Sequence, residues 1–509
     1  MSLPPQEQNN LAGPGKKTTV DKDLRRIGQL EKASRGISHS HINLGYGLLF
    51  LLIVWAFAHV LTGAGGDNSI IIVAAVVGAY MAMNIGANDV ANNVGPAVGS
   101  KALTMVGALF IAAIFEAGGA MIAGGEVVST ISKSIVSPDA FADKSVFIWA
   151  MMAALLSAAL WVNLATTVGA PVSTTHSIVG GVLGAGVTAA GLSAVDWYVM
   201  AKIAASWVIS PVLGGIIAAL FLAFIKFTIL YRDDKIEAAK RWVPVLVAIM
   251  AAAFSGYLVM KGLKRIWKPD AVMIAGIASA AFLVTYLTVR ARIHRAAANL
   301  ENRRRSVGEL FTVPLICAAA LLSFAHGSND VANAVGPLAA IVNAVTSGAV
   351  ASKVTLPFWV LAIGAIGISV GLLLYGPKII QVVGEKITRL NRVRAFCVAL
   401  SASITVIIAS TLGLPVSSTH IAVGAVFGVG FLREFLTNRR LGIPSAPLGN
   451  SEPRVNPRSE KALNRWAKAR KRKLVRRRHI MTIVGAWLIT VPASALLASA
   501  IYFAVRTFV

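Results

Sequence analysis

Two nearly identical stretches decide the fold of this chain. Residues 86–96 read GANDVANNVGP and residues 327–337 read GSNDVANAVGP, identical at nine of eleven positions. A second pair follows in the same order: residues 169–180 read GAPVSTTHSIVG and residues 413–424 read GLPVSSTHIAVG, identical at eight of twelve. The two offsets are 241 and 244 residues. Two motifs repeated in order at nearly the same offset indicate an internal duplication.

The rest of the chain has the composition of a membrane protein. Of its 509 residues, 56% are hydrophobic and 14% are charged, whereas about a quarter of the residues in soluble domains are charged. Apolar runs long enough to cross a bilayer have to be helical, because lipid offers the backbone no hydrogen-bond partners. Such runs lie at 44–62, 70–86, 103–125, 146–168, 175–190, 199–226, 243–260, 271–289, 311–325, 356–376, 395–412, 419–436 and 480–505. The composition excludes a soluble enzyme and a disordered scaffold.

The net charge of +26 is explained by membrane topology. Most basic residues lie between the apolar runs, and cytoplasmic loops of membrane proteins are enriched in Lys and Arg. We therefore place the basic N-terminus in the cytoplasm and the C-terminus outside, in a multi-pass protein of the cell membrane, specifically the bacterial inner membrane. We expect no nucleic-acid partner. One loop disagrees, because 261–269 carries four basic residues yet counts as external.

Span counting also predicts how the two copies are related. The run 70–86 enters from the outside, whereas its copy at 311–325 enters from the inside. The copies are therefore antiparallel, as in many secondary transporters, whose binding sites lie near the midplane between inverted repeats. We predict an all-α polytopic membrane protein, an inverted-repeat helical bundle with broken helices and about 12–13 transmembrane spans.

The runs and motifs divide the chain into seven predicted segments. These are a cytoplasmic polar and basic arm (1–43), an additional N-terminal transmembrane helix (44–62), the first transport repeat (70–226), a connecting region with two transmembrane helices (227–309), the second transport repeat (310–432), a basic cytoplasmic loop (433–479) and the last transmembrane helix of the second repeat (480–509). The basic loop is expected to be solvated, partly helical near 459–478, and in contact with anionic lipid headgroups.

Two matched carboxylates, Asp89 and Asp330, lie in the NDVAN motifs. An ionisable residue at membrane depth costs roughly 2.5–3.5 kcal/mol on insertion scales, so both are functional candidates. Amide oxygens accompany them at Asn88, Asn92, Asn329 and Asn333. Carboxylate and amide oxygens suit a hard cation such as Na⁺, or a protonatable site, better than zinc. The alternative is that these side chains cap helices at a buried break.

Hydroxyl groups form the second matched set, after Pro171 and Pro415. The set comprises Ser173, Thr174, Thr175, Ser417, Ser418 and Thr419. Hydroxyls and open N–H groups at a helix start can hold an oxyanion, although they also serve as ordinary N-caps. Because these motifs contain no Lys or Arg, bound cations would have to offset the nearby aspartates. Binding of the two charges would then be interdependent, which is a physical route to symport.

Four further titratable residues are candidates. His176 and His420 end the hydroxyl runs at matched positions and are expected to donate either to the anion or to a backbone carbonyl. His326 has Ile85 as its counterpart, so it is either a packed or gating histidine or a ligand. Glu116 is a candidate coupling or proton residue, and it is unmatched in the second copy, where Gly367 or a neighbour stands.

These motifs closely resemble those of the inorganic phosphate transporter (PiT) family. The resemblance covers about 70–505 and implies an inverted-repeat bundle, often dimeric, that carries phosphate by symport with Na⁺ or H⁺, in some bacterial members as a metal–phosphate complex. It matches Asp89, Asn92, Asp330 and Asn333 to the binding motif, the six hydroxyl residues to the hydroxyl-rich segment, and Glu116 to an acidic position of the first repeat. The additional helix 44–62 and the apolar or small residues near Met151 and Ala399 depart from the family.

The predicted function is secondary active symport of inorganic phosphate, with a co-transported Na⁺ or H⁺, no cofactor and no enzymatic activity. Membrane lipid and a second copy of the chain are the expected partners. A Na⁺ site is a candidate at Asp89 and Asp330. The alternatives are a sulfate permease on the same scaffold, since sulfate is also a tetrahedral oxyanion, and an anion channel, which would need no cation.

Overall fold

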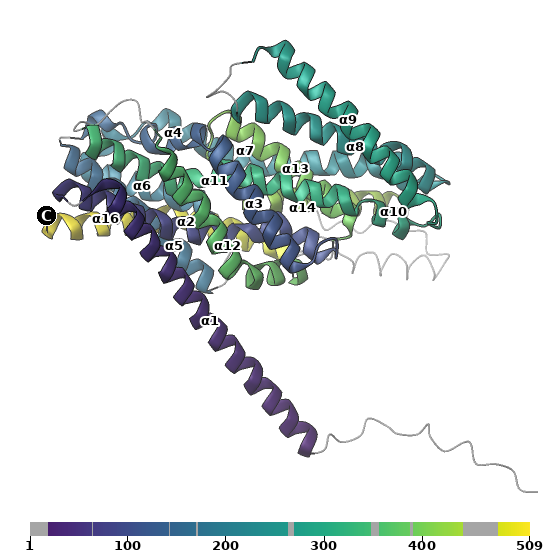
Figure 1. Cartoon of the computed structure of the whole chain (residues 1–509), viewed down its shortest axis with the longest axis horizontal. Coiled ribbons are helices and arrows are strands. Elements are labelled where there is room, and N and C mark those ends of the chain that lie inside the picture. Colours follow the sequence, from purple (N-terminus) through teal and green to yellow (C-terminus); the bar gives the residue numbers. More distant parts are fainter. Residues whose placement is uncertain are drawn as a thin grey trace, which may run out of the picture. The chain divides into compact units, whose positions relative to one another are not determined.

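The computed structural model describes residues 19–63, 65–141, 143–168, 172–262, 269–347, 356–386, 390–440 and 477–508. These residues are overwhelmingly helical, and the sole β feature among them is an isolated bridge between Val136 and Val195 (Figure 1). Within these ranges, 12 helices are long and apolar enough to cross a membrane. The predicted all-α polytopic membrane fold is therefore confirmed.

The described residues form a series of helices. In chain order they are α1 (Thr19–Thr62), α2 (Gly66–Gly99), α3 (Met105–Ala123), α4 (Gly125–Lys133), η1 (Pro138–Ala140), α5 (Lys144–Val168), α6 (Thr174–Ala190), η2 (Leu192–Ala194), α7 (Trp197–Ile225), η3 (Lys226–Leu230), α8 (Lys235–Tyr257), η4 (Leu258–Gly262), α9 (Ala271–Ala297), α10 (Arg304–Leu310), α11 (Thr312–Ser347), α12 (Phe358–Lys386), α13 (Arg392–Thr411), α14 (Ser418–Arg440) and α16 (Arg477–Phe508).

Two predicted segments, the polar arm (1–43) and the basic loop (433–479), lie partly outside the described residues. Helix α1 begins at Thr19, so residues 19–43 of the predicted polar arm are helical, while 1–18 lie outside the described residues. Most of the predicted basic loop, residues 441–476, also lies outside them. The chain from Met1 to Phe50 and the chain from Leu51 onward are separate units.

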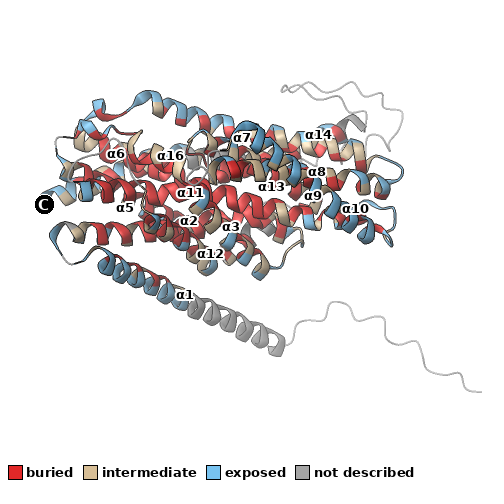
Figure 2. Cartoon of the chain, turned by 45° about the horizontal axis from the view of Figure 1, so that its top comes forward, coloured by how far each residue is buried: buried red, intermediate tan, exposed pale blue. Residues whose placement is uncertain are grey.

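The helices of the second unit pack crosswise between the two repeats. Helix α2 packs along α12, and α3 packs along α11; likewise α6 packs along α16, and α7 along α14. Each pair joins one helix of the first repeat to one of the second. Exchange of the repeats relates the pair α2–α12 to the pair α11–α3, and the pair α6–α16 to the pair α14–α7. Burial is greatest along α11, where 89% of the most apolar stretch is buried (Figure 2). The two copies therefore form one bundle with a shared interior.

Matched glycines let these helix pairs approach closely. A Cβ atom at Gly86 on α2 would collide with the carbonyl oxygen of Ile368 on α12, and one at Gly327 on α11 would collide with the carbonyl oxygen of Glu116 on α3. Since Gly86 and Gly327 are equivalent, Ile368 and Glu116 occupy equivalent places. The counterpart of Glu116 is thus Ile368, the residue after Gly367.

The helix breaks occur at one motif pair and not at the other. Both NDVAN segments lie inside uninterrupted helices, α2 and α11. The alternative in which the aspartates cap helices at a buried break is therefore wrong, and these polar side chains bond to neighbouring elements instead. The breaks lie at the start of the second motifs, between α5 and α6 and between α13 and α14. In the latter, Gly413 has a φ of 68°, a conformation that favours glycine.

The basic loop that contradicted the topology begins at a partly exposed ion pair. Lys261 Nζ, at the end of η4, lies 3.1 Å from Glu126 Oε1 and donates to the Thr411 carbonyl oxygen at 3.2 Å. One of the four basic residues of that loop is therefore ion-paired, and the other three lie outside the described residues. The two helices predicted in the connecting region are both present, as α8 with η4 and as α9.

Candidate functional site

The N-termini of α6 and α14 meet at the centre of the bundle. Ser173 Oγ accepts from the His176 backbone N–H at 3.1 Å, and Ser417 Oγ accepts from the His420 N–H at 3.3 Å. These two serines are therefore N-caps. Helices α5 and α6 form one hairpin and α13 and α14 form the other, each with its tip at the break between the helices. The two tips touch, because Thr175 Oγ1 donates to the Val416 carbonyl oxygen at 3.0 Å. Two helix N-termini with free N–H groups thus converge, a setting that favours anions.

Asp89 receives hydroxyl groups from both repeats. Thr174 Oγ1 donates to Asp89 Oδ2 at 2.7 Å, and Thr419 Oγ1 lies 3.0 Å from Asp89 Oδ1. Asp330 has the equivalent contact within its own repeat, with Ser418 Oγ at 3.4 Å. Each carboxylate is at most 1% exposed. The structure therefore brings both predicted aspartates and three of the predicted hydroxyls into one buried group of polar side chains, referred to below as the chamber.

The asparagines of the NDVAN motifs reach across to the opposite repeat. Asn92 Nδ2 lies 2.8 Å from Thr419 Oγ1, and Asn333 Nδ2 lies 3.2 Å from Thr175 Oγ1. These two contacts are equivalent under exchange of the repeats. They fix the spacing between the NDVAN helices and the hairpin tips, so the carboxylates and the hydroxyls keep their relative positions.

The other two predicted asparagines lie at the edge of the chamber. The Asn88 amide is 2.8 Å from Thr166 Oγ1 on α5, and Asn329 Nδ2 donates to Ser410 Oγ on α13 at 2.9 Å. Asn329 Oδ1 also accepts from the Val416 N–H at 3.2 Å. These amides hold the ends of α5 and α13, and the backbone beyond one of them, against the NDVAN helices.

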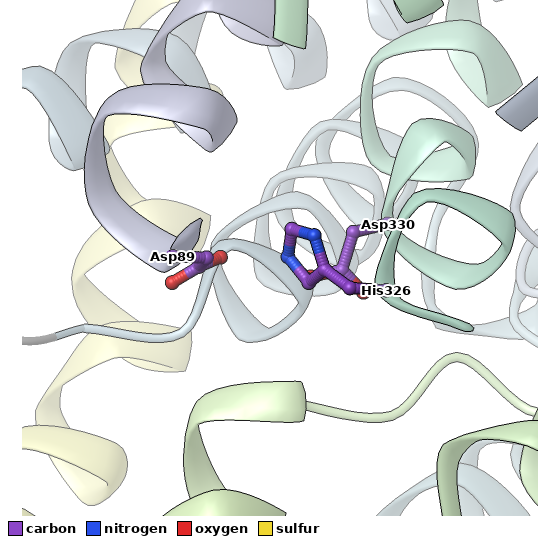
Figure 3. A group of neighbouring side chains, drawn as sticks. All are labelled: Asp89, His326 and Asp330. Atoms are coloured by element: carbon purple, nitrogen blue, oxygen red, sulfur yellow. The ribbon is translucent and has the colours of Figure 1, made fainter. Parts of the chain in front are cut away.

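One half of the chamber has a polar cluster that the other half lacks. His326 Nδ1 lies 2.6 Å from Glu116 Oε2, and His326 Nε2 lies 2.9 Å from Asp330 Oδ2. Asn93 Nδ2 donates to Glu116 Oε1 at 2.7 Å. All four side chains are at most 1% exposed. Figure 3 shows Asp89 converging from α2 on the His326 and Asp330 side chains of α11.

The equivalent positions in the other half are apolar. His326 corresponds to Ile85, Glu116 to Ile368, and Asn93 to Ala334. Sequence reasoning identified Glu116 and His326 as candidates but missed Asn93. The signal was present, because Asn93 and Ala334 stand at one of the two positions where the quoted motifs differ.

The matched histidines pack on each other. The ring centroids of His176 and His420 are 4.6 Å apart and the rings are nearly perpendicular. The ring centroids of His176 and Trp207 are 3.8 Å apart. Neither ring nitrogen of His176 has a hydrogen bond to the part of the chain that the structure describes. The contacts of His176 are therefore those of a packed residue beneath the hairpin tips.

The chamber concentrates buried acidic groups. Three carboxylates, Asp89, Asp330 and Glu116, are buried together, and their ion pairs within the described ranges are to His326 alone. Buried charges are costly unless paired, so the cluster requires protons or cations. Carboxylate and amide oxygens dominate the lining and can bind a hard cation such as Na⁺.

Comparison with known proteins identifies the family. Residues 85–498 match the phosphate transporter family. The chain belongs to that family. A protein of Helicobacter pylori (strain J99) named "Putative phosphate permease" is 47% identical over 95% of this chain and 98% of its own length. A namesake from Thermococcus kodakarensis is 39% identical over 71% of this chain and 89% of its own.

A solved structure resembles this transporter over most of its length. It is titled the sodium-dependent phosphate transporter, has a TM-score of 0.75 and 34% identity, and covers 87% of this chain and 100% of its own. The family and this structural neighbour are transporters rather than enzymes, which confirms the prediction of a multi-pass membrane transporter with an inverted-repeat helical bundle.

Proposed function

We propose that this transporter carries inorganic phosphate across the cell membrane by symport with a cation, Na⁺ or H⁺. One observation carries the proposal: Asp89 is contacted by hydroxyl groups from both hairpin tips, Thr174 and Thr419. The carboxylate that would bind the cation is therefore hydrogen-bonded to hydroxyls that would bind the anion. We assign transport to the first repeat (70–226) and to the second repeat (310–432) with its last helix (480–509).

The coupling follows from how many partners a hydroxyl proton can have. In the structure Thr174 Oγ1 donates to Asp89, and one O–H group donates one strong hydrogen bond at a time. A cation or proton bound to Asp89 neutralises the carboxylate and weakens its hydrogen bond with Thr174. The Thr174 hydroxyl can then donate to a phosphate oxygen instead. Cation binding would thus precede and strengthen phosphate binding. Without a bound cation or proton, the Asp89 carboxylate would stay hydrogen-bonded to the hydroxyls and would repel the phosphate anion.

The anion would be held by neutral donors. These are the open N–H groups of α6 and α14, the hydroxyls of Thr174, Thr175, Ser418 and Thr419, the capping Ser173 and Ser417, and the amides of Asn92 and Asn333. Helix N-termini favour phosphate groups for the same electrostatic reason. Since no Lys or Arg side chain stands in these motifs, affinity for phosphate would depend on the bound cation.

The coupling ion, the substrate form and the assembly are also proposals. A relative with a similar fold is titled sodium-dependent, which supports Na⁺ as the coupling ion. We place the N-terminus in the cytoplasm and the C-terminus outside, in the bacterial inner membrane, and we expect a homodimer surrounded by lipid. A metal–phosphate complex is a further form in which the substrate could be carried.

The test is uptake of radiolabelled phosphate into proteoliposomes, with Na⁺ and pH gradients imposed separately. We expect concentrative uptake with one gradient and none when both are dissipated, and weak competition by sulfate. Asp89→Asn should abolish concentrative uptake, because the amide lacks the negative charge that balances a bound cation and does not take up a proton at neutral pH. Uptake that follows the phosphate gradient alone, with Asp89→Asn as active as wild type, would show a channel. Strong competition by sulfate would favour a sulfate permease.

A further inference from the structure

Helix α2 carries a row of polar side chains that leads away from Asp89. Tyr80, Asn84 and Asn88 are spaced by four residues, so they lie on one face of the helix. Eight residues of helix span about 12 Å. The row therefore runs from Asp89 toward the N-terminal end of α2, which is the outer end in the proposed orientation.

Helix α5 adds two polar side chains to this row. Asn163 Nδ2 donates to Asn84 Oδ1 at 3.1 Å, and the Asn88 amide lies 2.8 Å from Thr166 Oγ1. The other end of the Asn88 amide is 3.1 Å from Asp89 Oδ1. Amide and hydroxyl groups thus follow one another from Asn163 to the carboxylate, each within a helical turn of the next.

The end of the row that is farther from Asp89 is exposed. Asn84 and Asn88 are buried, whereas Asn163 and the neighbouring Thr167 are exposed on α5, a helix long and apolar enough to span the membrane. Among the described residues, nothing donates to the side-chain oxygen of Asn163. Lipid offers no donor for such an oxygen, but water does. The exposed end of the row therefore suits a hydrated entrance.

The second repeat lacks this row. The equivalents of three of its members are apolar, namely Leu321 for Tyr80, Ala325 for Asn84 and Ile407 for Asn163. Leu321 and Ala325 are buried, so the same helix packs well in the second repeat without polar groups at these positions. Packing alone does not account for the row, and a task on one side of the membrane does.

We propose that this row is the route by which the coupling cation reaches Asp89 from the side of the membrane where α2 begins. Amide and hydroxyl oxygens replace the water around a hard cation such as Na⁺, or order the water molecules that relay a proton. Because these groups are neutral, they do not trap the cation before it reaches the carboxylate. The inference rests on the proposed function, since it takes Asp89 as the residue that binds the coupling cation.

Asn84→Leu separates a route from a structural contact. Leu has a similar shape but no oxygen, so the cation enters and leaves more slowly while its affinity, set at Asp89, is unchanged. We expect the initial rate of phosphate uptake, under the gradient that drives wild-type uptake, to fall at least ~10-fold, as for one lost hydrogen bond in a barrier. The dissociation constant of phosphate at equilibrium in lipid nanodiscs, which reports the bound cation as well, should stay as in wild type.

Asn343→Leu on α11 is the matched control. Asn343 and Asn84 are both buried, and each donates to the carbonyl oxygen four residues before it, at 2.7 and 2.9 Å. Because Asn343 lies outside the row, its variant should take up phosphate at the wild-type rate. Equal slowing in the two variants, or a loss of phosphate affinity in Asn84→Leu that matches its loss of rate, overturns the route.

Thiol labelling tests the route without transport, and it decides the matter if Asn84→Leu fails to fold. Cys317 and Cys397 are first replaced by Ala. Asn163→Cys should then react with a membrane-impermeant maleimide from the same side as Ser69→Cys, which is exposed near the start of α2, because the reactive thiolate forms in water and not in lipid. Ile407→Cys, the equivalent position in the second repeat, should react from neither side.

The outcomes separate the route from the symport. Asn163→Cys that reacts from neither side, or only from the side opposite Ser69→Cys, overturns the route. Coupled phosphate uptake by wild type together with an unreactive Asn163→Cys removes the route alone. If wild type shows no coupled uptake, the proposed function fails and the route fails with it.

Discussion

At the scale of single residues, the chamber consists of polar groups that contact each other directly. Asp89 bonds to Thr174 and Thr419, and Asp330 contacts His326 and Ser418. The aspartates could be predicted from sequence, because a charge inside an apolar run is rare and has to have a partner. The role of Asn93 could not, because its partner Glu116 lies on another helix and only packing brings the two together.

Replacing Thr174 by Val tests the hydroxyl link. Thr174→Val keeps the shape and removes the hydroxyl that, in the proposed coupling, turns from Asp89 to a phosphate oxygen; a hydrogen bond to a charged group is worth about 1.5–3 kcal/mol. We expect phosphate KM in uptake assays to rise by roughly 10- to 150-fold, since 1.4 kcal/mol corresponds to tenfold. Thr346→Val is the control, because Thr346 Oγ1 donates to the Val342 carbonyl of its own helix at 2.8 Å. An unchanged KM in Thr174→Val would contradict the link.

At the scale of helices, the elements and the breaks at the second motifs were predictable, whereas the continuity of the helices through NDVAN was not. Each apolar run corresponds to a helix, but α2 and α11 continue well beyond the predicted ends at residues 86 and 325. Gly and Asn have low helix propensity, which suggested a break at NDVAN. Tertiary contacts override that propensity here, because the asparagines bond to the hairpins and the glycines sit against neighbouring backbones.

The close helix contacts predict a sharp response to an added methyl group. Gly86→Ala and Gly327→Ala each place a Cβ against a carbonyl oxygen of the partner helix, and overpacking of this kind costs ~1–3 kcal/mol or more. We expect both variants to have a lower apparent melting temperature in detergent and reduced yield. Gly276→Ala on α9, where a Cβ meets nothing within 4 Å, should be neutral or stabilising. Equal stability of all three would show that the contacts are loose.

At the scale of the whole molecule, the sequence revealed the duplication but not the way in which the copies pack. Periodicity shows that a helix is apolar, yet it does not show which partner that helix will have. The crosswise pairing of α2 with α12 and of α3 with α11 therefore became visible only in the structure. The equivalence of Glu116 and Ile368 depends on that pairing.

Membrane orientation is the prediction that belongs to this scale. With Cys317 and Cys397 replaced by Ala, Thr507→Cys should react with a membrane-impermeant maleimide on intact cells. Arg232→Cys should react only after permeabilisation, because span counting places it in the cytoplasm. Both residues are exposed in the structure. The reverse labelling pattern would invert the assigned orientation.

The crosswise pairing also bears on how such a molecule could have arisen. Before the two halves were joined, the same contacts would have required two identical chains inserted in opposite directions, a homodimer of dual topology. In that ancestor every side chain of the chamber would have been present twice. A glutamate facing a histidine on one side and two isoleucines on the other could not be encoded by a single gene copy. Once the two copies are separate parts of one gene, the two sides can diverge, and here only one side has an imidazole and a glutamate.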